Sequence, residues 1–357
     1  MKKVVSIALA LLMVAVMLPV MAMAEGTTLQ SRIDAGETTI TLTENVTESI
    51  TIPKDKTVTL NLNGNTLTNE ANKDTITVAL GGTLTIEGAG TVDNISHGRA
   101  AVYNNGTVTI NGGTYTRSEE KGTGNPNSDN GNSWYTICNH GVMTVNAGAT
   151  VKNKGTFSSV FENGYYSYHV EGTNNAAPAL TINGGTFEGG KITIKNDDGG
   201  ILEINNGTFT NAWNRVVYNT NVATINGGSF SCPATNEIAV DSNKLNDNLN
   251  KGVMTITGGT FDGKVTQSNG TFTVSGGTFK KGVDESYIVD GKKLDANGNV
   301  VPESITIIVP SDGGNTTTTP STDNTKNPGT GANDFVGVAA AMAVVSLLGA
   351  AAVIRKK

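Results

Sequence analysis

The sequence predicts an all-β protein, a parallel β-helix (solenoid) of about nine to eleven coils, with a secretory signal peptide before it and a transmembrane segment after it. Three observations predict the coils. Gly accounts for 44 of 357 residues, whereas charged residues make up 16% and aromatic residues 5%. Apolar residues alternate with Thr in short runs, which is the period of a half-buried strand. One phrase containing Asn-Gly-Gly returns along most of the chain, and such repetition is typical of solenoids.

Residues 1–24 have the three parts of a secretory signal peptide. Met1-Lys2-Lys3 is the basic start, Val4 to Val20 is the apolar run, and Ala22-Met23-Ala24 supplies the small residues before the cleavage site. We expect a signal peptidase to recognise Ala22 and Ala24 and to cut before Glu25. An uncleaved membrane anchor is the alternative interpretation.

Residues 25–310 carry the repeat and are predicted to form the β-helix domain. The full phrase is Val108-Thr109-Ile110-Asn111-Gly112-Gly113-Thr114-Tyr115. Complete copies and variants of it occur at Leu60–Leu67, Leu84–Val92, Met143–Val151, Leu180–Phe187, Leu202–Phe209, Ala223–Phe230, Met254–Phe261 and Phe272–Phe279. The steps between copies mostly lie in the low twenties of residues, and insertions lengthen some of them to about 35.

Each phrase predicts a strand, a sharp turn and a second strand. The apolar positions point inward, Gly permits the positive φ of the turn, and the inward aromatic or aliphatic residue after Thr begins the next strand. The Asn residues before the glycines, such as Asn111, Asn183, Asn205 and Asn226, are expected to stack as an amide ladder. A nine-residue calcium roll and immunoglobulin-like modules are excluded, because neither period matches.

The exposed ends of a solenoid invite edge pairing, so caps are expected. Leu29 to Ile33 is predicted to form a short capping helix before the first coil. Val300 to Val309 is predicted to form a closing strand after the last one.

Three further segments follow the repeat. Residues 311–326, SDGGNTTTTPSTDNTK, have the composition of an extended linker. Phe335 to Ile354 is a 20-residue stretch without charge, long enough to cross a bilayer, and residues 355–357 form a basic tail that stays cytoplasmic. Between linker and span stands Asn327-Pro328-Gly329-Thr330-Gly331.

This order of pentapeptide, apolar span and basic tail resembles the cell-wall sorting signal of Gram-positive surface proteins. The resemblance implies that a sortase cleaves the Thr330–Gly331 bond and joins Thr330 to peptidoglycan, which places the protein at the cell surface. Asn327 stands where the commonest signal has Leu, so the choice of sortase stays open. A plain tail-anchored membrane protein is the alternative.

The segment TITLTENVTESITIPKDKTVTLNLNGNTLT, followed by the NGGTF phrases, resembles the pectate-lyase-type right-handed β-helix of secreted adhesive repeat proteins. The resemblance covers about residues 27–309 and implies display and adhesion to glycan or protein ligands. A polysaccharide-degrading enzyme of the same fold and a passive surface spacer are the alternatives.

Candidate catalytic groups are sparse, so we expect no enzyme, no cofactor and no metal. Asp197-Asp198 is the one adjacent acidic pair inside a coil, and we interpret it as a turn before Gly-Gly. The histidines, His97, His140 and His169, lack Cys or carboxylate partners at ligand spacing and are interpreted as exposed loop residues. Cys138 and Cys232 lie about three coils apart, beyond disulfide reach, and are predicted to be free, buried thiols.

The insertions in the two longest repeats concentrate aromatic residues: Trp134, Tyr135, Phe157, Phe161, Tyr165, Tyr166, Tyr168 and the neighbouring His169. These rings either pack together as a small satellite core or form an exposed surface that stacks on sugars or anchors a protein. For the second interpretation, the candidate ligand-binding residues are Trp134, Tyr135, Tyr165, Tyr166 and Tyr168.

The charge balance argues against nucleic acid as a partner. Leaving out the five cations and the one anion of the terminal segments takes the formal charge from −6 to −10. Only Arg99, Arg117 and Arg215 then remain beyond Arg32. A body this acidic does not favour contact with a phosphate backbone.

Overall fold

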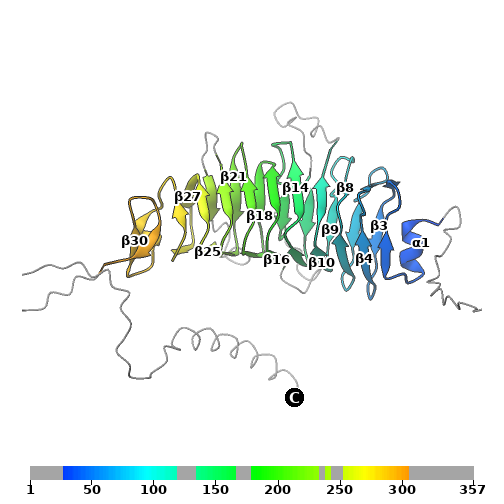
Figure 1. Cartoon of the computed structure of the whole chain (residues 1–357), viewed down its shortest axis with the longest axis horizontal. Coiled ribbons are helices and arrows are strands. Elements are labelled where there is room, and N and C mark those ends of the chain that lie inside the picture. Colours follow the sequence, from blue (N-terminus) through cyan, green and yellow to red (C-terminus); the bar gives the residue numbers. More distant parts are fainter. Residues whose placement is uncertain (1–26, 119–133, 166–177, 233–237, 243–251, 305–357) are drawn as a thin grey trace, which may run out of the picture. The chain divides into compact units, whose positions relative to one another are not determined.

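The computed structural model describes residues 27–118, 134–165, 178–232, 238–242 and 252–304 of the chain (Figure 1). The strands lie in the first of two compact units, which runs to Glu303. Three long parallel sheets stack as a solenoid-like β-helix, so the predicted all-β coil architecture is confirmed. Consecutive strands visit the first, second and third sheets in turn and then begin the next coil.

The strands of each sheet follow in chain order. The first sheet contains β1 (Thr39–Thr41), β4 (Thr57–Asn61), β7 (Thr83–Glu87), β10 (Thr107–Ile110), β13 (Val142–Val145), β16 (Ala179–Ile182), β19 (Ile201–Ile204), β22 (Val222–Ile225), β25 (Val253–Ile256) and β28 (Thr271–Val274). The second contains β2 (Val46–Thr47), β5 (Thr66–Thr68), β8 (Thr91–Asp93), β11 (Gly113–Thr116), β14 (Ala149–Asn153), β17 (Thr186–Gly189), β20 (Thr208–Thr210), β23 (Ser229–Ser231), β26 (Thr260–Asp262) and β29 (Thr278–Phe279). The third contains β3 (Ile50–Ile52), β6 (Ile76–Val78), β9 (Val102–Asn104), β12 (Ile137–Asn139), β15 (Phe161–Asn163), β18 (Ile192–Asn196), β21 (Arg215–Asn219), β24 (Ile238–Ser242) and β27 (Lys264–Gln267).

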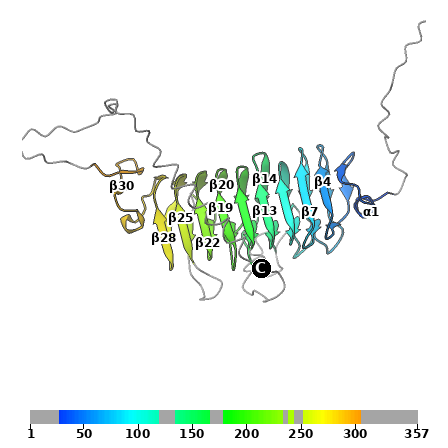
Figure 2. The ribbon, with the colours of Figure 1, turned by 90° about the horizontal axis from the view of Figure 1, so that it is seen from below.

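The repeated phrase forms the first and second strands of each coil. Figure 2 shows strands of the first sheet, from β4 to β28, side by side. Ile110 lies opposite Ile86 and Val145 in this sheet, as the phrase predicts. The copy at Leu60–Leu67 is shifted, because Leu60, not Leu62, lies opposite Ile86. That coil has two extra residues at its turn, and Leu62 is buried there as an additional core residue.

Inward side chains form one continuous apolar core between the three sheets. On the second sheet this core includes a stack of parallel rings with centroids 4.8 Å apart, formed by Phe187, Phe209, Phe230, Phe261 and Phe279. The spacing is the separation between paired strands. The Phe at the end of the last five repeated phrases therefore couples these coils to one another through the core.

The turn between the first and second sheets explains the Asn-Gly-Gly sequence. A Cβ at Gly227 would stand 2.5 Å from the carbonyl oxygen of Asn205 in the coil below, so no side chain fits there. Gly228 has φ +103°, a conformation that L-residues rarely adopt. The first glycine thus permits close stacking, and the second permits the turn.

The predicted amide ladder is confirmed at this turn, and Asn146 belongs to it as well. Each amide nitrogen donates to the oxygen of the coil below, at 2.8 Å from Asn146 to Asn111 and 3.0 Å from Asn183 to Asn146. Asn205 and Asn226 continue the ladder with donor–acceptor distances of 3.0 and 2.9 Å.

A second, buried amide ladder closes the turn between the third and first sheets. It consists of Asn104, Asn139, Asn163, Asn196 and Asn219, each joined to the next by a 2.7 Å hydrogen bond. All five are fully buried, and their amides also donate to backbone carbonyls of the following strands, such as Val142 and Ile201. These bonds offset the cost of burying the amides.

Both ends of the β-helix are covered. The predicted N-terminal cap is confirmed as α1 (Leu29–Asp34), which buries Leu29 and Ile33 against the first coil. At the other end, the 3₁₀ helix η1 (Glu285–Tyr287) and the hairpin of β30 (Lys292–Leu294) and β31 (Val300–Pro302) follow the last coil. The predicted closing strand, Val300 to Val309, thus begins as β31, which ends at Pro302 and pairs antiparallel within this hairpin. Residues 305–309 lie outside the described part of the chain.

Within the described part of the chain, no helix is long and apolar enough to cross a membrane. The predicted span, Phe335 to Ile354, lies outside the described residues.

Candidate functional site

The residues predicted for export and sorting all lie outside the described part of the chain. They are Ala22, Ala24, Glu25, Asn327, Pro328, Gly329, Thr330 and Gly331. Tyr166 and Tyr168, two of the candidate ligand-binding residues, also lie outside it, as does His169.

Trp134 and Tyr135 pack into a small cluster on the outer face of the third sheet. Their rings meet edge to face at 5.3 Å. Tyr135 is 4% exposed and packs with Ala100 and Cys138, while Trp134 covers the cluster from outside and is half-buried. The satellite-core interpretation therefore holds for this pair, and Tyr135 offers little surface to a ligand.

The other aromatic residues of the insertions that the structure describes do not form one patch. Phe161 is fully buried in the main core, opposite Ile137 and Ile194 on the third sheet. Tyr165 is 8% exposed, and its backbone pairs with that of Asp198. Phe157 is exposed. The expectation of an exposed aromatic surface is thus wrong for Tyr135, Phe161 and Tyr165, because coil stacking buries them.

Titratable side chains gather instead on the outer face of the third sheet. The strand register places one column of side chains on five successive strands, Tyr103, Cys138, Glu162, Lys195 and Tyr218, each one position before the last residue of its strand. Cys138 and Glu162 are at most 1% exposed. His140 and Asp197, from the turns after their strands, flank this column.

The geometry of this cluster corrects the interpretation of His140 as an isolated, exposed residue. The His140 side chain is 15% exposed, and its Nε2 lies 3.9 Å from Oε2 of Glu162. Its Nδ1 lies 3.2 Å from the Tyr103 hydroxyl, and its ring lies 5.0 Å from that of Tyr165. His97 is exposed as expected.

Asp197 and Asp198 form the predicted turn, since the amide of Gly200 donates to the carbonyl oxygen of Asp197 at 2.9 Å. Both carboxylates are nevertheless buried, at 2% and 4% exposure. The ammonium of Lys195 pairs with the carboxylate of Asp197. The turn therefore brings a buried ion pair beside Glu162.

Burial sets the protonation of this cluster. It raises the pKa of Glu162, although the neighbouring His140 and Lys195 oppose the shift and Asp197 adds to it. Burial also raises the pKa of the Cys138 thiol, with Glu162 contributing, and raises the pKa of Tyr103 to about 12. The Oε1 atom of Glu162 has no hydrogen-bond partner among the described residues. The raised pKa means that this carboxyl group keeps its proton to higher pH than an exposed glutamate does.

The sequence contains a signal for this column that its analysis missed. The triplets Val102-Tyr103-Asn104, Ile137-Cys138-Asn139, Phe161-Glu162-Asn163, Ile194-Lys195-Asn196 and Val217-Tyr218-Asn219 share an inward apolar residue, an outward residue and a ladder Asn. Aligning these triplets would have placed Cys138 beside Glu162 and Glu162 beside Lys195.

Other candidate groups have structural roles. Cys138 and Cys232 are free and buried, as predicted, and their strands lie four coils apart rather than three. Arg117 is 3% exposed and donates to the carbonyl oxygens of Ser96 and Trp134. No three His, Cys, Asp or Glu side chains of the described residues are arranged to hold a metal ion.

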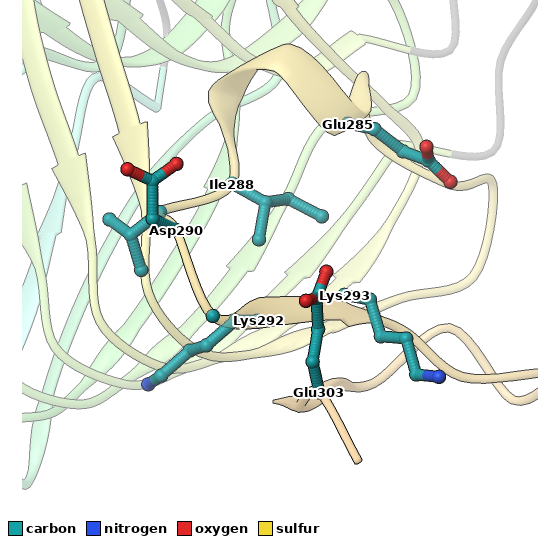
Figure 3. A pocket seen from close by; sticks show the side chains of 8 residues that line it. Glu285, Ile288, Asp290, Lys292, Lys293 and Glu303 are labelled. Carbon is teal, nitrogen blue, oxygen red and sulfur yellow. The ribbon is translucent and has the colours of Figure 1, made fainter. Parts of the chain in front are cut away.

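A shallow pocket of about 300 Å³ lies in the C-terminal cap (Figure 3). Its lining includes Glu285, Asp290, Lys292, Lys293 and Glu303, and in Figure 3 these charged groups point in different directions. The pocket therefore lacks the convergent polar groups of a small-molecule site.

The chain matches no protein-family model, no curated protein and no solved structure.

Proposed function

We propose that this chain is a cell-surface display and adhesion protein that binds glycan or protein ligands. It would be exported by its signal peptide and joined to peptidoglycan by a sortase. The observation that carries the anchoring is the order of the pentapeptide 327–331, the uncharged span 335–354 and the basic tail. Until transfer, the span would hold the chain at the membrane of a Gram-positive cell.

The β-helix supports the display role. Its three long sheets continue through nine or ten strands and end in caps, so the described unit presents long lateral faces and protected ends. Short edges protected in this way suit a solenoid exposed outside the cell. We propose that the coils are right-handed, as parallel crossover connections nearly always are.

One observation favours the enzyme alternative. A polysaccharide-degrading β-helix would bring carboxylates and a basic group to one face, and Glu162, Asp197 and Lys195 meet in this way. All three are largely buried, at no more than 14% side-chain exposure. Substrate contact would require this face to open, so adhesion stays the preferred proposal over an enzyme or a passive spacer.

The anchoring is tested by replacing the residue whose carboxyl group would be transferred. Cells that produce the wild-type chain should retain it in hot detergent and release it only after peptidoglycan digestion. Thr330→Ala should shift most of the protein into the detergent extract. The matched control, Thr322→Ala in the linker, should behave as the wild type does. Extraction of the wild type by detergent alone would contradict covalent attachment.

Adhesion and catalysis are separated in one further assay. Cells displaying the wild-type chain are expected to adhere to immobilised mucin or glycans, and cells lacking the chain are not. Release of unsaturated uronides from polygalacturonate, abolished in Glu162→Gln, would instead favour the enzyme. If the chain shows neither adhesion nor uronide release, the passive-spacer alternative is favoured.

A further inference from the structure

The outer face of the first sheet carries three regular columns of side chains between β13 and β25. The aliphatic column consists of Val142, Ala179, Ile201, Val222 and Val253. Beside it, the hydroxyl column consists of Thr144, Thr181, Thr224 and Thr255, interrupted by Glu203. The third column is the exposed amide ladder of Asn146, Asn183, Asn205 and Asn226. No bulge interrupts this sheet, so the columns are straight.

The aliphatic column is partly exposed where a solvated sheet usually has polar residues. Val142 and Ile201 are 44% and 46% exposed, and no residue of the column is fully buried. The equivalent positions in earlier coils are Thr57, Thr83 and Thr107. A run of aliphatic residues over five successive coils has no role in the core, and exposed apolar surface of this extent marks an interaction site.

The face is almost uncharged. The strands of the first sheet, all of which the structure describes, contain the carboxylates Glu87 and Glu203 and no Lys, Arg or His. Exposed protein surface is usually about a quarter to a third charged. An uncharged ligand therefore complements this face, whereas an acidic one would meet, on the strands from β13 to β25, the carboxylate of Glu203 and no cation.

The amide ladder retains hydrogen-bonding capacity toward solvent. Within the ladder, Asn183 uses one N–H group toward Asn146 and one oxygen lone pair toward Asn205. An amide has two N–H groups and two lone pairs, so one of each remains. Asn226 differs, because its amide nitrogen donates to both Asn205 and Glu203. The coils repeat every 4.8 Å, close to the length of one sugar residue in an extended β-1,4-linked chain.

We infer that the outer face of the first sheet, from β13 to β25, binds an extended, uncharged polysaccharide lying along the coil axis. The sugar C–H faces pack on the aliphatic column, and the hydroxyl groups bond to the Thr and Asn columns. This inference rests on the proposed display function, for which it names the ligand class and the binding face. It moves the binding surface away from the aromatic insertions to a regular sheet.

The test uses the full-length chain in a nonionic detergent and affinity electrophoresis. The probes are hydroxyethylcellulose, an uncharged β-1,4-glucan, and polygalacturonate, its acidic counterpart. The wild type should be retarded by hydroxyethylcellulose and not by polygalacturonate. Val142→Lys combined with Ile201→Lys should weaken the binding about tenfold or more. Ile95→Lys, at a position 41% exposed outside this sheet, is the matched control and should bind as the wild type does.

Three results would overturn the inference: no retardation of the wild type, equal retardation of the double variant, or a wild-type dimer that the two lysines dissociate. The last would identify the face as a contact between copies.

Failure of polysaccharide binding is distinguishable from failure of the proposed display function. A chain that is covalently anchored but binds neither probe retains the display role, whereas a chain that binds but is extracted by detergent loses only the anchoring. Circular dichroism confirms that each variant is folded.

Discussion

Glu162 shows at the scale of one residue how stacking changes chemistry. On an isolated strand its side chain would face water, yet in the coil it is 1% exposed beside Cys138 and His140. Burial removes the carboxylate from water and so disfavours its charged form, which raises the pKa. A carboxyl group with a raised pKa stabilises the folded state at pH values below its unfolded pKa. That contribution is lost as the pH rises through the folded pKa.

Glu162→Gln should therefore change the pH dependence of stability. The free energy of unfolding of the variant, relative to the wild type, is expected to increase from pH 4 to pH 8, because Gln has no charge to bury. Urea unfolding at several pH values measures this difference. Glu203→Gln, an exposed carboxylate on the first sheet, is the control and should give a smaller change. A difference for Glu162→Gln that is independent of pH would contradict the burial argument.

At the scale of elements, α1 depends on a residue from the first coil. The amides of Leu29 and Gln30 both donate to the carboxylate of Glu48 at 2.8 Å, and the Thr28 hydroxyl accepts from the amide of Ser31. The first helical amides have no partners within a helix. One side chain thus fixes the start of the cap against the coil that it covers.

Removing this contact should loosen the cap. Glu48→Ala is expected to cost about 1–3 kcal/mol of unfolding free energy, because two amides lose a charged acceptor. In Glu48→Ala, amide hydrogen exchange in Leu29–Asp34 should be faster than in the wild type, whereas exchange in the central coils should change less. Glu44→Ala, a nearby exposed carboxylate, is the control. Unchanged exchange in the cap of Glu48→Ala would refute the proposed role of Glu48.

At the scale of the whole described unit, each coil is stabilised mainly by its neighbours. The Phe stack carries this coupling, since Phe209 lies between two parallel rings at 4.8 Å and Phe279, at the end, has one such neighbour. Both side chains are at most 1% exposed. The position of a ring along the axis therefore decides how much it contributes.

Phe209→Ala is expected to destabilise the protein by about 3–5 kcal/mol. Phe279→Ala should cost less, by about 0.5–1.5 kcal/mol, since it removes one ring pair rather than two. Denaturant unfolding measures both. Phe157→Ala, at an exposed position, should stay within about 0.5 kcal/mol of the wild type. Equal costs for Phe209→Ala and Phe279→Ala would show that the stack adds no coupling between coils.

The local pattern was sufficient for much of the fold. Alternation with Thr predicted the strands, the Asn-Gly-Gly sequence predicted the turn, and Asn111, Asn183, Asn205 and Asn226 form the predicted ladder. These features depend on residues close in sequence and on backbone conformations that few residues adopt. The first repeat was misaligned by two residues because a turn with an extra buried Leu62 also contains Asn and Gly.

By itself, the sequence determined that this chain is a stack of short parallel strands, and it predicts an export signal and a wall-anchoring signal at the ends. Only the tertiary structure decided that His140 meets Glu162, that Tyr135 and Phe161 are buried, and that five aliphatic residues form a partly exposed column. The physical reason is the variable length of the insertions. A strand's own pattern decides which side chains point outward. Which of them become neighbours depends on the register between coils, in which paired residues lie 18 to 37 positions apart in the sequence.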